Sequence, residues 1–318
     1  MINNGIDISI IVPMHNEEGN VNLFYQRTSN TLKQLKISYE IIFINDGSKD
    51  NTQALIYQLS KQDEAVKYID LSKNFGHQIA VSAGLAHASG NAVVIIDADL
   101  QDPPELINSL YHKFSEGYDV VYAKRKKRQG ESAMKLWTAS LFYRLLKKIT
   151  NVDMPLDTGD FRIISKRIVK ILNNMPERNK FLRGQISWVG YNQSYVEYDR
   201  EARQNGDTSY TYSKMIRFAL DGITSFSDIP LRLVTYLGLF ISVVTGLLTL
   251  YALYSRFISK IYTAGWTSLM IVILFFGGVQ MIAIGIIGEY LSRMNDDIRQ
   301  RPLFLIKKTN LEDKSTDV

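Results

Sequence analysis

Two aspartates separated by one residue follow an apolar run in the first third of the chain. Asp97 and Asp99 come directly after the β-rich run 92–96, and Gln101-Asp102-Pro103-Pro104 follows them. On a continuing strand, side chains two positions apart point to the same side. Paired carboxylates are costly unless a cation or water neutralises them, and Mg²⁺ or Mn²⁺ bridged to a diphosphate does so. We therefore predict a divalent metal site at Asp97 and Asp99. A polar turn is the alternative for an Asp-x-Asp without this context.

Acidic side chains also follow two earlier apolar runs. Glu17 lies just past residues 8–12, and Asp46 lies just past residues 40–44. Each loop taken alone is explained as well by a helix cap and a turn. Because ligands bind at the carboxyl ends of parallel strands, the three loops together place Glu17, Asp46 and Asp97 on one rim. A base and a ribose can be held there by hydrogen bonds.

Short β-rich runs alternate with helix-like stretches in this region. The predicted strands are residues 8–12, 40–44, 66–71 and 92–96, and the predicted helices are residues 20–35, 51–62 and 77–88. This alternation predicts an α/β domain with a mostly parallel sheet covered on both faces. The chain has no Gly-x-Gly-x-x-Gly after the first strand and no Walker A loop. A nucleotide would therefore be held by carboxylates and metal rather than by a glycine-rich cradle.

The composition excludes several kinds of site. The 318 residues include no cysteine, which removes disulfides, thiolate metal sites and a cysteine nucleophile. The four histidines show no metal-ligand spacing. The net charge of +5 is too small to indicate nucleic acid as a partner, and it suits work beside anionic phosphates or lipids.

Two uncharged stretches near the C-terminus are long enough to cross a membrane. Residues 233–255 lie between Arg232 and Arg256, and residues 261–288 lie between Lys260 and Glu289. About 20 apolar residues in a helix cross a hydrocarbon core of ~30 Å. The alternative, a buried hairpin in a soluble core, is disfavoured because soluble helices rarely stay uncharged on all faces. The glycines in both stretches allow close helix contact and a homo-oligomer.

Basic residues precede an amphipathic stretch in the middle of the chain. The run 124–128 is followed at residues 134–149 by apolar positions at helical spacing with lysine and arginine between them. A solvated loop is the usual alternative for a charged run. The basic amphipathic pattern favours binding to a membrane surface, with Arg125, Arg128 and Lys135 meeting a lipid phosphate. A second such stretch, residues 214–227, leads into the first span.

These features predict four regions. Residues 1–212 form a catalytic domain, 213–230 a juxtamembrane amphipathic segment, 231–291 two transmembrane helices (about 232–256 and 265–290), and 292–318 a cytoplasmic tail. Two spans place both flanks on one side. The chain opens on a strand-like segment without a signal peptide, and basic residues follow the second span. We therefore expect a multi-pass protein of the inner (plasma) membrane with a cytoplasmic catalytic domain.

Four motifs in order resemble a known family. Val-Pro-x-x-Asn-Glu at 12–17, Asn-Asp-Gly-Ser-x-Asp at 45–50, Asp-x-Asp-x-Gln-Asp-Pro-Pro at 97–104 and the stretch 157–162 are similar to those of family 2 glycosyltransferases with a GT-A fold. Within that family, the chain resembles the polyprenyl-phosphate glycosyltransferases. These include dolichol-phosphate mannose synthase and the GtrB-type bactoprenol glucosyltransferases, which carry two C-terminal membrane helices. The resemblance extends from Ile8 to about Arg301.

The resemblance implies a role for each matching position. Pro13, Glu17 and Asp46 would hold the nucleoside, Asp97 and Asp99 the metal and diphosphate, and Gln101 the region of the sugar phosphate. Asp157 would be the catalytic carboxylate, acting with Asp99. A segment that closes over the donor would contribute Arg200, Arg203 and Tyr210. His77, in an element similar to Arg-Asn-Phe-Gly, is either a donor-site hydrogen-bonding residue or structural.

The implied reaction is inverting transfer of a hexose, with glucose favoured, from a UDP-sugar to undecaprenyl or another polyprenyl phosphate for cell-envelope glycan modification. A phosphate monoester is already largely ionised at neutral pH, so we expect Asp157 to orient the acceptor or a cation rather than to act as a strong base. Transfer of N-acetylglucosamine, mannose or an aminoarabinose-type sugar is an alternative. So are a processive polysaccharide synthase and a non-catalytic scaffold or flippase component.

Overall fold

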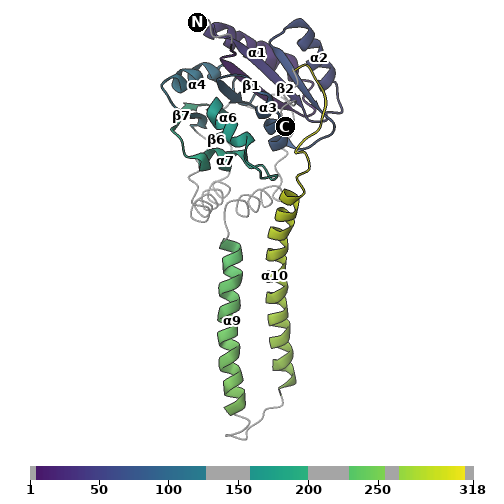
Figure 1. Ribbon diagram of the computed structural model, residues 1–318, viewed down its shortest axis with the longest axis vertical. Coiled ribbons are helices and arrows are strands. Elements are labelled where there is room, and N and C mark those ends of the chain that lie inside the picture. Colours follow the sequence, from purple (N-terminus) through teal and green to yellow (C-terminus); the bar gives the residue numbers. More distant parts are fainter. Residues whose placement is uncertain (1–4, 127–157, 200–228, 255–264, 312–318) are drawn as a thin grey trace. The chain divides into compact units, whose positions relative to one another are not determined.

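The computed structural model describes residues 5–126, 158–199, 229–254 and 265–311 (Figure 1). The chain divides into two compact units. The first comprises Met1–Ile216 together with Arg301–Val318, and the second comprises Arg217–Gln300. Residues from both ends of the chain therefore build the first unit, and the second unit is an insertion between them.

A single mixed sheet organises the first unit. Within the described residues its strand order is β7-β5-β6-β4-β1-β2-β3-β8. The middle strands β4, β1, β2 and β3 are parallel to one another, whereas β6 runs antiparallel to β4 and β5, and β8 runs antiparallel to β3. The bounds are β1 (Ile8–Met14), β2 (Tyr39–Asn45), β3 (Val66–Leu71), β4 (Ala92–Ile95), β5 (Val120–Arg125), β6 (Thr158–Ser165), β7 (Gln193–Tyr198) and β8 (Ile306–Thr309).

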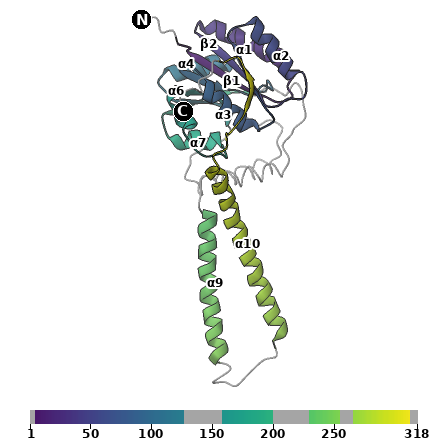
Figure 2. The ribbon, with the colours of Figure 1, turned by 45° about the vertical axis from the view of Figure 1, so that its right-hand side comes forward.

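Helices cover both faces of this sheet (Figures 1 and 2). One face packs against α1 (Val21–Leu35), α2 (Thr52–Gln62) and α4 (Leu106–Ser115), and the other against α3 (His77–His87), α6 (Lys166–Asn173) and α7 (Leu182–Val189). Strand side chains alternate between the two layers. Ile10 and Val12 enter the first core and Ile11 enters the second, so β1 is buried along its whole length.

The predicted α/β class and the mostly parallel central sheet are confirmed. Strands and helices occur where the alternation of runs placed them. One premise was wrong, because β4 ends at Ile95 and Asp97 and Asp99 lie in the following loop rather than on a continuing strand. The turn at this point includes Leu100 with a left-handed φ of 57°.

The segment expected as a tail, residues 292–318, carries a strand of the first unit's sheet. β8 pairs with β3, and the Asn310 side chain extends this pairing: its Oδ1 accepts the Tyr68 N–H at 2.8 Å, and its Nδ2 donates to the Val66 carbonyl at 3.1 Å. At the other end of β8, the Ser72 N–H donates to the Leu305 carbonyl at 2.9 Å. The chain after the second unit thus closes one edge of the sheet.

The second unit contains two long apolar helices, α9 (Ile229–Tyr254) and α10 (Trp266–Ile298). α9 begins with Pro230 in its first turn, where the missing N–H costs no hydrogen bond. Both helices expose large hydrophobic side chains, among them Leu233, Phe240 and Phe275. Of the described residues, the stretch Phe275–Ile298 is long and apolar enough to cross a membrane, and Ile229–Ile241 is a shorter apolar helix. The expectation of two spans is therefore met in part.

Candidate active site

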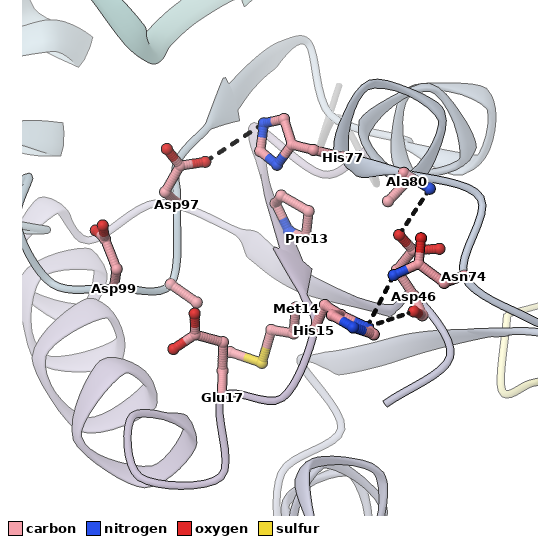
Figure 3. Close-up of a pocket in the computed structure, with 12 residues that line it drawn as sticks. Pro13, Met14, His15, Glu17, Asp46, Asn74, His77, Ala80, Asp97 and Asp99 are labelled. Carbon is pink, nitrogen blue, oxygen red and sulfur yellow. Dashed lines mark hydrogen bonds and ion pairs between the residues drawn. The ribbon is translucent and has the colours of Figure 1, made fainter. Parts of the chain in front are cut away.

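A cleft of about 310 Å³ opens where β1, β2 and β4 end and α3 begins (Figure 3). Six residues singled out from the sequence lie on its wall, and others come from the same loops. The lining residues are Pro13, Met14, His15, Glu17, Asp46, Asn74, Gly76, His77, Ala80, Asp97, Ala98 and Asp99. The parallel strands bring the rim together because their carboxyl ends meet at one edge of the sheet.

Asp97 carries a buried carboxylate oxygen without a hydrogen-bond partner in the part of the chain that the structure describes. Its Oδ1 lies 3.5 Å from His77 Nε2. Burial raises the pKa of Asp97, and the nearby Asp160 and Asp99 raise it further, to about 6, against the opposing charge of His77. A buried oxygen without a hydrogen bond, beside further carboxylates, fits a hard divalent cation, which would satisfy this oxygen and offset the repulsion.

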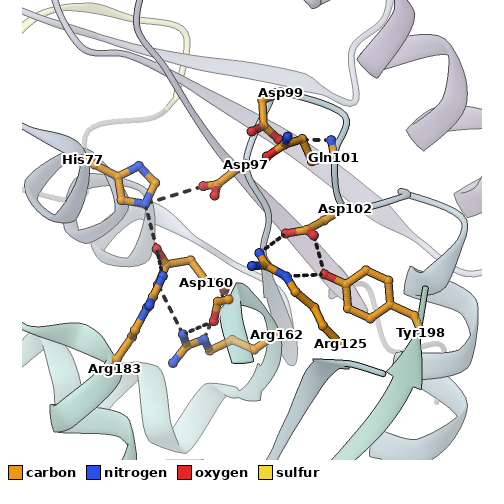
Figure 4. A network of polar contacts seen from close by, with 11 residues as sticks. His77, Asp97, Asp99, Gln101, Asp102, Arg125, Asp160, Arg162, Arg183 and Tyr198 are labelled. Carbon is orange, nitrogen blue, oxygen red and sulfur yellow. Dashed lines mark hydrogen bonds and ion pairs between the residues drawn. The ribbon is translucent and has the colours of Figure 1, made fainter. Parts of the chain in front are cut away.

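Asp160 on β6 provides a third carboxylate, which contacts the same ring nitrogen of His77 as Asp97 does (Figure 4). Its Oδ2 lies 3.3 Å from His77 Nε2, and the guanidinium of Arg183 binds it with two hydrogen bonds of 2.7 and 3.0 Å. The buried Arg162 adds a contact of 3.2 Å. Although burial favours its neutral form, Arg183, His77 and Arg162 hold the pKa of Asp160 well below the ordinary value.

His77 contacts the carboxylates of both Asp97 and Asp160. Burial lowers its pKa, but the charges of Asp97 and Asp160 outweigh this and raise it to about 9. The ligand atoms of His77, Asp97 and Asp160 all lie within 4.8 Å of one another. These three residues come from α3, the loop after β4, and β6, so no short sequence motif contains them.

Asp46 is buried, and its carboxylate accepts hydrogen bonds from the backbone. Its Oδ1 accepts the Phe75 N–H at 2.7 Å and its Oδ2 accepts the Gly76 N–H at 2.9 Å, while its backbone carbonyl is 2.8 Å from His15 Nδ1. The carboxylate therefore fixes the backbone that enters α3. Its predicted contact with a nucleoside stays a prediction.

Glu17 occupies the other side of the cleft. Its Oε2 accepts the Asn20 side-chain N–H at 2.6 Å, and its backbone N–H donates to Thr52 Oγ1 at 2.9 Å. Pro13 lies on β1 at the cleft floor. Nearby, the Gln101 N–H donates to Asp99 Oδ1 at 3.1 Å, which closes the loop after β4.

Arg125 is partly exposed and belongs to another polar cluster, with the buried residues Asp102 and Tyr198. Its Nη2 lies 3.6 Å from Oδ2 of Asp102, which is 1% exposed, and its Nε lies 3.3 Å from the Tyr198 hydroxyl. The Tyr198 hydroxyl also donates to Asp102. The structure thus pairs Arg125 with Asp102 and Tyr198, and a role for it with a lipid phosphate stays a prediction.

Several predicted residues lie outside the described ranges. They are Asp157, Arg200, Arg203, Tyr210, Arg128 and Lys135, as are the two amphipathic stretches at 134–149 and 214–227. The sequence places the acceptor-side carboxylate at Asp157, which stays a prediction, and it did not single out Asp160, three positions on. The alternating run from Thr158 to Ser165, which predicts a strand, was the available signal that Asp160 sits on the sheet.

Comparison with known proteins finds relatives that match along most of the chain. The model of the family described as "Glycosyl transferase family 2" matches residues 9–172. An uncharacterized glycosyltransferase of Bacillus subtilis is 45% identical over 96% of this chain and 94% of its own. A prophage bactoprenol glucosyl transferase homolog of Escherichia coli is 43% identical over 95% of this chain and 98% of its own, and the bactoprenol glucosyl transferase of Shigella phage SfII is 42% identical over the same shares. Among solved structures, glucosyl-3-phosphoglycerate synthase of Mycobacterium tuberculosis is 20% identical, covers 69% of this chain and 78% of its own, and gives a TM-score of 0.47.

Proposed function

The chain belongs to glycosyl transferase family 2, and we propose that it transfers glucose from a UDP-sugar to a polyprenyl phosphate at the cytoplasmic face of the membrane. The observation that carries this proposal is the similarity along nearly the whole chain to proteins named bactoprenol glucosyl transferase, at 42–43% identity. The carboxylate-lined cleft supplies the chemistry that such a transfer needs. The chain is a glycosyltransferase, and the proposal concerns its donor, acceptor and location.

The donor would lie in the cleft between the strand ends. Asp97 and Asp99 would hold Mg²⁺ or Mn²⁺, because Asp97 presents there a buried oxygen without a hydrogen bond among the described residues. Such an ion, when bound, neutralises charge on a diphosphate leaving group. The nucleoside would lie toward Pro13, Glu17 and Asp46. The anomeric carbon would then face the side of the cleft where Asp160 lies.

The acceptor phosphate needs little activation. A phosphate monoester has a second pKa near ~6, so its oxygen is a nucleophile at neutral pH without a strong base. The low pKa of Asp160 makes this carboxylate a poor proton acceptor. We assign it the role of orienting charge on the acceptor side, the role that the sequence suggested for Asp157. The phosphate oxygen forms a bond to the anomeric carbon as the bond to the nucleoside diphosphate breaks, and this single displacement inverts the centre.

The fold supports a membrane insertion that crosses an even number of times. Strands β1 to β7 precede α9, β8 follows α10, and all belong to the same sheet. A single crossing would put β8 and its partner β3 on opposite sides of the bilayer, so it is incompatible with the sheet. We infer that α9 and α10 each cross once. A polyprenyl chain, held in lipid by ~0.8 kcal/mol per buried CH₂, would present its phosphate at the same surface.

The test is transfer by the full-length protein in membranes. Membranes containing the protein are incubated with undecaprenyl phosphate, Mg²⁺ and a panel of radiolabelled nucleotide sugars, and the lipid fraction is resolved by chromatography. We expect a lipid-linked monosaccharide from UDP-glucose, in excess of that from UDP-N-acetylglucosamine or GDP-mannose. A long polymer would contradict the proposal in favour of a processive synthase, and no labelled lipid from any donor would overturn it.

A further inference from the structure

His77 stands between the two sides of the site. It is the first residue of α3, and its Nε2 lies 3.5 Å from Asp97 Oδ1 and 3.3 Å from Asp160 Oδ2 (Figure 4). Asp97 belongs to the loop on the donor side, and Asp160 to the strand on the acceptor side. One ring nitrogen therefore contacts both carboxylates whose separation sets the geometry of transfer.

The backbone of His77 is held in place by a buried anchor. The Asp46 carboxylate accepts the N–H groups of Phe75 and Gly76, the two residues immediately before His77. Gly76 adopts a φ of 97°, which turns the chain into the helix. Asp46 is 3% exposed, and both its carboxylate oxygens accept backbone N–H groups. The backbone from which the His77 ring enters the cleft is therefore fixed.

Asp160 is held from two sides. Arg183 grips both its oxygens from α7, and Arg162 contacts Oδ1 from the same strand. Both arginines lie on the side of Asp160 away from His77, and His77, which lines the cleft, contacts Oδ2 (Figure 4). Without the His77 N–H, Asp160 would turn toward the arginines and away from the cleft, and misplacement of a catalytic carboxylate by 1 Å can cost about 100-fold in rate.

We propose that His77 is a positioning residue for glycosyl transfer: its Nε2–H holds Asp160 at a fixed distance from Asp97. This inference rests on the proposed function, because it assigns the two carboxylates to opposite substrates. The role requires an N–H at the position of Nε2 and not the imidazole itself. A glutamine at position 77 can present an amide N–H at nearly the same reach, whereas alanine and methionine cannot.

The experiment compares H77A, H77M and H77Q with wild type in the lipid-phosphate transfer assay, measuring kcat, the KM for UDP-glucose and the thermal unfolding temperature. We expect H77A and H77M to lower kcat about 10- to 100-fold with the donor KM changed less than about threefold, because the interaction positions a group rather than binding the donor. We expect H77Q to recover most of kcat. H112A, at an exposed histidine on α4, serves as the matched control and should behave as wild type.

Three results would overturn the inference while leaving the proposed function intact: an unchanged kcat in H77A and H77M, a raised donor KM with unchanged kcat, or an H77Q variant as impaired as H77A. H77M fills the space of the ring, so it keeps the test valid if H77A does not fold. A wild-type protein that transfers no sugar overturns the proposed function and this inference together.

Discussion

Gly47 shows how strongly one residue constrains the site. It adopts a φ of 64°, and a Cβ at this position would lie 2.5 Å from the Asn74 backbone nitrogen and 2.6 Å from the Lys73 carbonyl carbon. The obstacle is backbone, which cannot rotate away. The loop after β2 and the loop that leads to His77 therefore touch at a point where no side chain fits.

We predict that Gly47→Ala destabilises the protein by about 1–3 kcal/mol and lowers transfer, because left-handed strain adds to a displacement of the loop before α3. Chemical or thermal unfolding and the transfer assay measure the two effects. Gly5→Ala, where no atom lies within 4 Å of the added Cβ, is the control and should be neutral. Wild-type stability in Gly47→Ala would mean that the two loops are free to separate.

The positions of the rim residues could be predicted because they depend only on which residues follow each strand in the sequence. A polar residue directly after a buried parallel strand must lie at the sheet's carboxyl edge, and this placed Glu17, Asp46 and Asp97 correctly in space. The residues that contact the cleft through His77 could not be found in this way. Asp160 and Arg183 reach the site from β6 and α7, which are joined to it through tertiary packing.

At the scale of elements, the first four strands and first three helices were predictable because each carries a clear pattern of apolar residues. β8 was not, since its four residues, Ile-Lys-Lys-Thr, include two lysines and show little apolar content. It is a strand because β3 offers a free edge more than 230 positions earlier in the chain, with Asn310 bonding to the backbone of Val66 and Tyr68. Such long-range pairing leaves no local signal.

At the scale of the whole molecule, the sheet predicts the topology of the inserted helices. The chain contains no cysteine, so single cysteines give a clean background for labelling. We predict that Ser115→Cys before α9 and Lys307→Cys after α10 react with a membrane-impermeant maleimide only when the cytoplasmic side is opened. Gly265→Cys, at the start of α10, should react from outside in intact cells. All three positions are exposed.

Labelling of Ser115→Cys and Lys307→Cys from opposite sides would contradict the sheet pairing of β3 with β8. Labelling of all three from the cytoplasmic side would contradict the two crossings and leave the helices on the membrane surface. Each outcome is read from the same three variants, with a detergent-solubilised sample as the control for reactivity.

The central claim is that carboxylates at the strand ends support divalent-dependent transfer of glucose to a lipid phosphate. The measurement is the amount of lipid-linked glucose formed from UDP-glucose by wild type, by Asp97→Asn and by the Asp97→Ala/Asp99→Ala double variant, with Mg²⁺ or with EDTA. We predict product from wild type with Mg²⁺, none with EDTA, recovery on adding excess Mg²⁺, and a loss of at least about 100-fold in both variants. Undiminished synthesis by the double variant, or by wild type in EDTA, would contradict the account.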